Sequence, residues 1–192
     1  DDRFFINAIV TDALGRPDSN WGTLDEGYVW TAAEVGTILP FDEEALGGPT
    51  VLSAIWSGTN LNHFSPTPEF RWANAFGLQW QGHLTEHLGY FAQGAVAQET
   101  MSPLAAQFSV GMSLEAPFGR RGDLVGGAFN WSQPSDADPT AVSEQSLMEF
   151  FYRVQITASC QLTPDLQIIL DPGLRPDGDP VFVFGLRLTT DF

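Results

Sequence analysis

The sequence predicts an all-β fold, an antiparallel transmembrane β-barrel, and three observations support this class. About ten segments alternate apolar and polar residues with a period of two, and none shows helical periodicity. Where the alternation is clear, no charged residue falls on the apolar face. The segment 182–192 ends on Phe192, an aromatic residue of its apolar face, as the closing strand of such a barrel does. We therefore expect lipid on one face and water on the other.

The composition narrows the function classes. The chain has 192 residues with 43% hydrophobic residues, 17% charged residues and a net charge of −16. Its eight basic residues are all Arg, and this acidic balance argues against nucleic-acid binding. No run approaches the roughly 18 apolar residues of a membrane helix, so barrels are the remaining membrane option. The lone Cys160 excludes an internal disulfide, and the absence of a signal peptide predicts a processed chain or a fragment.

The first third of the chain has three expected strands. Segment 3–11 is apolar and β-branched, with a facing that the sequence does not assign. Segment 12–27 is rich in Gly, Pro, Asp and Asn and is predicted to be a long loop. Segments 28–36 and 51–57 are the next expected strands, and 58–68 is expected to be a polar loop.

From residue 70 onwards the alternation is clean. One face of the fourth strand has Phe76, Leu78 and Trp80, the other has Arg71 and Gln79, and Asn74 is a polar exception on the apolar side. The further expected strands are 87–98, 107–115, 125–132, 148–157, 161–170 and 182–192. A charge on a lipid-facing position would cost about 2–4 kcal/mol at the bilayer midplane, so its absence there favours a barrel over a sandwich.

The connections support the same interpretation. Bacterial barrels have short turns at one end and longer loops at the other. Counted backwards from the last strand, the connections 171–180, 158–160, 133–143 and 117–122 alternate in this way. The brief connection 100–103 and the long segment between the second and third strands are exceptions.

The last third of the chain resembles a known family. The ordered blocks FYRVQIT (151–157), LTPDLQ (162–167), DPG (171–173) and GLR (185–187), with a final Phe, are similar to the closing strands of carbohydrate-selective outer-membrane porins. The resemblance covers 149–192 well and the rest loosely. It implies a sixteen-stranded channel that admits sugars across the bacterial outer membrane. Because about ten strands are visible here, we expect either the C-terminal portion of a larger porin or a shortened relative with a narrower barrel. We treat 1–192 as one barrel domain.

Counting inward positions up from the turn ends places Arg153, Asp165 and Arg187 at a similar height. We predict that these side chains and their neighbours line a constriction, because guanidinium, amide and carboxylate groups match sugar hydroxyls. The alternative is an internal salt-bridge network that only holds the wall. The predicted lining residues are Arg153, Asp165, Arg187, Glu149, Gln155, Gln167, Arg71 and Gln79.

Other motifs give weaker indications of function. His83-Leu84-Thr85-Glu86-His87 matches the H-x-x-E-H pattern of zinc peptidases, but it straddles a predicted turn rather than lying on a helix. Arg121-Gly122-Asp123 is expected in a turn, where an adhesion role is disfavoured. Acidic loop residues could offer oxygen ligands to Ca²⁺, although no regular spacing supports this: Asp136, Asp138, Asp171, Asp177 and Asp179. Aromatics expected in interfacial girdles are Trp80, Phe118, Trp131, Phe150 and Phe192.

The sequence thus predicts a passive carbohydrate porin of the outer membrane, without catalysis, cofactor or metal, surrounded by lipid and open to trimerisation. Two alternatives remain at this point. One is a soluble β-sandwich or calyx that binds a small ligand. The other is an outer-membrane barrel hydrolase, for which His63, His83 and His87 are poorly placed.

Overall fold

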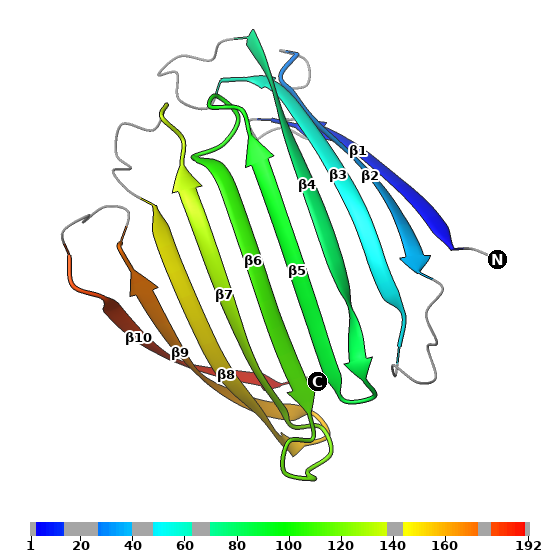
Figure 1. Cartoon of the computed structure of the whole chain (residues 1–192), viewed down its shortest axis with the longest axis vertical. Coiled ribbons are helices and arrows are strands. Elements are labelled where there is room, and N and C mark those ends of the chain that lie inside the picture. The colour runs from blue at the N-terminus through cyan, green and yellow to red at the C-terminus, as the bar shows by residue number, and fades with distance from the viewer. Residues whose placement is uncertain are drawn as a thin grey trace.

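Ten antiparallel strands pair in chain order to form one continuous sheet (Figure 1). A computed structural model describes residues 3–13, 27–39, 48–62, 70–137, 144–172 and 178–190. None of these residues belongs to a helix that is long and apolar enough to cross a membrane. The strands are β1 (Phe4–Asp12), β2 (Val29–Leu39), β3 (Thr50–Leu61), β4 (Phe70–Thr85), β5 (Leu88–Ala97), β6 (Leu104–Glu115), β7 (Leu124–Pro134), β8 (Gln145–Thr157), β9 (Cys160–Leu170) and β10 (Val181–Thr190).

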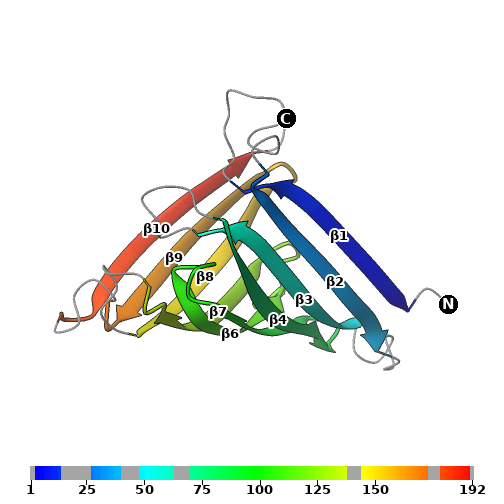
Figure 2. The same cartoon turned by 90° about the horizontal axis from the view of Figure 1, so that it is seen from above.

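The sheet curves around one axis. Viewed along that axis, β6 lies opposite the two edge strands, which rise on either side (Figure 2). The hydrogen-bonded order begins at β1 and ends at β10, so among the described strands no pair closes the sheet into a ring. The curvature is that of a barrel wall with both edges unpaired.

The expected strands are confirmed, with corrections at their ends. Residues 58–61 were expected in a loop, but they continue β3. Gly58 misled the prediction because glycine commonly marks a turn. Here the indole rings of Trp56 and Trp72 occupy the space above it: a Cβ on Gly58 would lie 2.8 Å from Trp72 Cζ2. A glycine can therefore stay within the strand because neighbouring aromatic side chains cover it. β6 and β8 also begin earlier than expected.

The register divides the side chains into two faces. In an antiparallel pair, residues directly opposite each other point to the same side. The apolar face is the one shared by Trp56, Phe76 and Leu78, and the polar face is the one that contains Gln79. Pairing with β2 assigns the facing of β1, which the sequence left open, since Ile6 lies opposite Val35 on the apolar face.

The apolar face is unusually exposed for a folded domain. Phe4, Phe76, Leu78 and Phe184 expose 78%, 56%, 64% and 79% of their surface. Exposed large apolar residues on most of the strands indicate a surface that meets something other than water. The expected alternation, apolar on one side and polar on the other, is therefore present in three dimensions.

Tight hairpins lie at one end of the sheet. Glu86 and His87 join β4 to β5, and Ala158 and Ser159 join β8 to β9 (Figure 1). We call this the turn end and the opposite one the loop end. The two connections that were exceptions to the expected alternation of short turns and long loops remain exceptions. In the structure they are residues 98–103, between β5 and β6, and residues 40–49, between β2 and β3.

At the turn end, Asp123 ties the β6–β7 connection to β8. Its carboxylate is buried and accepts hydrogen bonds from the Tyr152 hydroxyl at 2.6 Å and the Gln155 backbone N–H at 3.0 Å. The guanidinium of Arg120 lies 3.3 Å away. The Tyr152 hydrogen bond, then that of Gln155 and the charge of Arg120, lower the pKa of Asp123 against the opposing effect of burial. Because this carboxylate is enclosed, Arg121-Gly122-Asp123 does not present an accessible adhesion motif.

Towards the loop end, the polar exception Asn74 is fully accommodated on the apolar face. Its side-chain oxygen accepts hydrogen bonds from the indole N–H groups of Trp56 and Trp72, both at 3.1 Å. Its backbone N–H donates to Gln98 Oε1 at 2.9 Å and its amide N–H to the same oxygen at 3.4 Å. A polar residue can therefore sit on this face because its neighbours satisfy it.

Candidate functional site

An uncharged polar row crosses the polar face. Register places five amide or hydroxyl side chains directly opposite one another across β3 to β7: Ser53, Gln79, Gln93, Ser109 and Asn130. Three of these side chains take part in short hydrogen bonds, from Asn130 Nδ2 to Ser109 Oγ at 2.7 Å and from Gln79 Nε2 to Gln81 Oε1 at 2.8 Å. Such a row offers donors and acceptors without net charge.

Sequence reasoning named only Gln79 as a candidate within this row. The other four residues were missed because each occurs on a different strand. Their common level is visible only once the pairing register is known. The recurrence of amide and hydroxyl side chains on inward positions was the available signal.

The charged residues gather on the next part of the same face, over β8 to β10. Arg187 pairs with Thr163, and the β8–β9 register brings Arg153 level with the same Thr163. Asp165 instead pairs with Gly185, two residues further from the turn end. In the pairing register Asp165 is therefore not level with Arg153 and Arg187, as expected, but lies about 7 Å further along its strand. Counting from predicted strand ends missed the stagger between neighbouring strands.

The charged side chains are not joined into ion pairs. The Asp165 carboxylate lies over Gly185, in the space that a side chain on that glycine would fill. Within the described ranges, no salt bridge joins Asp165 to Arg153 or Arg187. The Nε of Arg153 is buried and has no hydrogen-bond partner among the described residues. Both guanidinium groups therefore have donors that no other described residue engages.

The remaining predicted lining residues fall at three places. Glu149 and Gln167 lie directly opposite each other beside the charged group. Gln155 is at the turn end, where its Nε2 donates to the backbone oxygen of Thr157 at 2.6 Å. Arg71 is exposed near the loop end of β4, on a different part of the sheet from the charged group on β8 to β10. The structure thus brings together part of the predicted set and separates Gln155, Arg71 and Gln79 from it.

Aromatic rings also lie on the polar face, each above a glycine of the adjacent strand. The directly opposed pairs are Phe5 with Gly36, Phe91 with Gly111, and Phe151 with Gly126. In every pair the ring occupies the space that a side chain on the glycine would need. The sequence analysis gave Phe91 and Phe151 no role.

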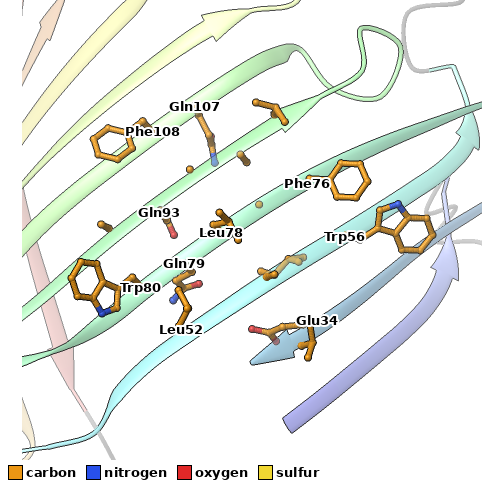
Figure 3. Close-up of a pocket in the computed structure, with 18 of the residues that line it drawn as sticks. Glu34, Leu52, Trp56, Phe76, Leu78, Gln79, Trp80, Gln93, Gln107 and Phe108 are labelled. Carbon is orange, nitrogen blue, oxygen red and sulfur yellow. The ribbon is translucent and has the colours of Figure 1, made fainter. Parts of the chain in front are cut away.

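The largest hollow is on the other face. It is a groove of about 1110 Å³ with a floor of small residues, including Ala54, Ala92 and Gly94. Trp56, Phe76, Leu78, Trp80 and Phe108 surround it, and Glu34, Gln79, Gln93 and Gln107 also contribute to its lining (Figure 3). Because most of the lining is apolar, the groove is poorly suited to a polar solute.

Aromatic residues with polar partners lie near both ends of the strands. At the turn end Trp80 packs edge-on against Tyr90, and Phe118 against Tyr152, with ring centroids 5.3 and 6.0 Å apart. At the loop end Trp131 Nε1 donates to Glu144 Oε2 at 3.0 Å. Amphipathic rings in two bands are typical of the two membrane interfaces. Phe150 is half exposed, and Phe192 lies outside the described residues.

The weaker motifs have no supporting geometry. His83 lies near the end of β4 and His87 lies in the hairpin that follows, so the H-x-x-E-H pattern is on a strand and turn rather than a helix. The described parts of the chain contain no group of three or more His, Cys, Asp or Glu side chains placed to hold a metal ion. Asp138 and Asp177, two of the acidic loop residues, lie outside the described residues, as does His63.

A sheet with a lipid-compatible face, a polar inner face and aromatic bands at its ends defines the wall of an outer-membrane β-barrel channel. The chain belongs to the carbohydrate-selective porin family OprB, whose profile matches residues 25–192. This membership places the protein in the bacterial outer membrane and confirms the resemblance expected from its closing strands. It also excludes the soluble sandwich or calyx.

Similar proteins show how much of a porin this chain represents. It is 32% identical to Porin AaxA of Chlamydia felis over 142 residues, which are 70% of this chain and 30% of that protein. It is 30% identical to Porin AaxA of Chlamydia abortus over 152 residues, or 76% and 32% of the two chains. The high-pH structure of Pseudomonas putida OprB shares the fold, with a TM-score of 0.74 at 15% identity. That match covers all of this chain and 56% of the other, while the chain spans about a third of the curated relatives' length.

Proposed function

We propose that the chain forms part of the wall of an outer-membrane porin through which carbohydrates and other small solutes diffuse passively. The uncharged row Ser53, Gln79, Gln93, Ser109 and Asn130 is the observation that carries this proposal. Amide and hydroxyl groups exchange hydrogen bonds with sugar hydroxyls as readily as with water, and they do not hold a neutral solute by charge. Family membership supports the same solute class.

The charged group on β8 to β10 would form the selective part of the lining. Arg153 and Arg187 share one level, and no ion pair within the described residues engages them. Their planar guanidinium groups are therefore available to solute hydroxyls or anions. Asp165, Glu149 and Gln167 would supply acceptors at adjacent levels, while Gln155 would act at the turn end and Arg71 at the loop-end mouth.

We propose no catalytic step, cofactor or metal for this function. A channel of this class requires only a lining and an open path. Association into a trimer remains a prediction.

Liposome swelling in sugars of graded size tests the proposal. Vesicles containing the protein extracted from native outer membranes should swell in mono- and disaccharides, more slowly as the solute grows, and little in charged solutes of equal size. A folded, heat-modifiable barrel that gives no swelling would mean a closed lumen, and the porin function would then be abandoned.

Charge reversal tests the lining. Arg153→Glu should alter the rate of sugar-driven swelling, and Arg121→Glu, an exposed turn residue, serves as the matched control. If Arg153→Glu changed neither swelling nor resistance to urea, Arg153 would be neither a lining residue nor a structural one.

A further inference from the structure

A second hollow lies on the polar face at the turn end, between Phe91 of β5 and Phe151 of β8. Its volume is about 490 Å³. Small-molecule sites in proteins have volumes of about 300–1,000 Å³. The hollow is therefore large enough to be considered a binding site.

Its two aromatic walls lean towards each other. The ring of Phe91 rests on Gly111 of β6, with Cζ 2.8 Å from the position a Cβ would take there. The ring of Phe151 rests on Gly126 of β7, with Cζ 2.6 Å from the corresponding position. Because β6 and β7 are neighbours, rings from two strands on opposite flanks converge on the same patch of wall.

Between the rings, the floor is polar and uncovered. Ser113 pairs with Gly89 on one side and Gly126 on the other, so neither neighbour at its level carries a side chain over it. Gln81 lies directly opposite Phe91, and His83 lines the turn side of the pocket. Over the described ranges, no Asp, Glu, Lys or Arg residue lines it. The pocket therefore combines two apolar ring faces with a neutral polar rim.

This combination fits one chemical class. A pyranose ring has two apolar C–H faces and a perimeter of hydroxyl groups. Aromatic rings pack against the faces, while amide, hydroxyl and imidazole groups bond to the perimeter. An open-chain polyol has no flat face to present to the rings.

We propose that the pocket between Phe91 and Phe151 binds a single neutral sugar ring, as a subsite beside the charged group on β8 to β10. This inference rests on the proposed function, since the sugar must reach the polar face. Arg153 and Glu149 border the pocket, because they lie directly opposite Leu124 and Ala128 of its lining. The Asp165 carboxylate points away from it, over Gly185 of β10, although Asp165 lies directly opposite Phe151.

The competing explanation is that the rings only cover glycines and stabilise the wall. Phe5 provides a matched control, because it makes the same cross-strand pair with Gly36 outside the pocket. A purely structural role predicts similar consequences for all three phenylalanines. A binding role predicts that Phe5 differs.

The test uses the full chain folded in detergent, titrated with glucose and with sorbitol as its open-chain counterpart, and read by saturation-transfer NMR. We expect saturable binding of glucose and little of sorbitol. The double variant Phe91→Leu and Phe151→Leu should weaken glucose binding about tenfold, since two ring contacts are lost, and Phe5→Leu less than about twofold. Ser113→Ala, which alters no ring, should weaken binding severalfold and serves if the double variant does not fold.

The outcomes separate this proposal from the porin function. Equal binding of glucose and sorbitol, equal losses in the Phe5 and double variants, or undiminished binding in the double variant or in Ser113→Ala would each overturn the subsite. Swelling of vesicles without any saturable glucose binding would overturn it as well and leave the channel intact. Binding lost only in the pocket variants, without swelling of vesicles, would support the subsite and overturn the channel.

Discussion

The two faces of this sheet treat polar atoms in opposite ways. On the apolar face the amide of Asn74 is satisfied within the protein, by two indole N–H groups and by Gln98. On the polar face, Arg153 Nε and His83 Nδ1 are buried without a protein partner among the described residues. A group that faces hydrocarbon must find its partner within the protein, as Asn74 does. A polar group on the other face is under this constraint only where water does not reach it.

The contrast between the two faces does not extend to the strand ends. Thr50 Oγ1 also lacks a partner in the described part of the chain, although it lies on the apolar side, over Gly82. Thr50 is the first residue of β3, at the turn end. The distinction between the faces therefore applies to the middle of the strands and weakens where the sheet approaches the turns.

The largest expected effect on stability comes from placing a charge on the apolar face. Leu78→Arg should destabilise the folded protein by about 2–4 kcal/mol in lipid vesicles, because Leu78 lies midway along β4 on the apolar face. Gln79→Arg, one residue further on the polar face, should change stability much less. Urea unfolding in vesicles measures both. Equal losses would show that the two faces do not meet different solvents.

A smaller effect is expected from the glycine beneath the two indoles. Gly58→Ala would place a methyl group 2.8 Å from Trp72 Cζ2 and 2.9 Å from Trp56 Cζ2, which should displace the rings from Asn74. The cost should be about 1–3 kcal/mol, the penalty of an unsatisfied polar group. The tryptophan emission should shift as the rings move.

Gly77→Ala is the control on the polar face. Its nearest contact would be 3.4 Å, so it should stay within about 1 kcal/mol of the wild type. If Gly58→Ala were equally mild, the Asn74 cluster would not be important for the apolar face.

Within the polar face, removing the unpaired arginines should change selectivity more than stability. Arg153→Gln combined with Arg187→Gln should shift the reversal potential of reconstituted channels towards cations by a few-fold in permeability ratio. The shift should be larger at 0.1 M than at 1 M salt, where the Debye length falls from about 10 Å to 3 Å. Arg121→Gln is the control. A shift of equal size in that control would place the selective charge outside the strands.

The smallest effect on stability is expected from a substitution of Asp123, at the turn end of the sheet. Its pKa is lowered from the usual 3.8, so the carboxylate is favoured in the folded state. This contribution is present above about pH 4 and is lost as the pH falls through the folded pKa below it. Asp123→Asn should therefore lower the unfolding midpoint at neutral pH and flatten its decline between pH 4 and 2.5.

The control for this prediction is Asp136→Asn, an exposed residue following β7. It should leave the acid dependence unchanged. An acid profile that Asp123→Asn does not alter would mean that the turn is held by the backbone contacts around it.

Much of the fold was predictable from single strands. In β4 and β8 the period-two pattern predicted which residues share a face, because the pattern follows from backbone geometry within one strand. The family was also predictable, since the closing blocks lie in β8 to β10. The sequence was less informative at Gly58, where the indoles that make room for a glycine come from its own strand and from β4.

The candidate site also has a part that the sequence predicts and a part that it does not. By itself, the sequence determined which class of side chain lies on each face, because the solvent on each side selects residue types locally. That pattern was sufficient to predict the barrel and its outer-membrane location. Only the tertiary structure decided which residues share a level. It separated Asp165 from Arg153 and Arg187, aligned the uncharged row over five strands, and brought Phe91 and Phe151 together over adjacent glycines. The physical reason is that the register between strands depends on turn geometry and cross-strand packing, which no single strand contains.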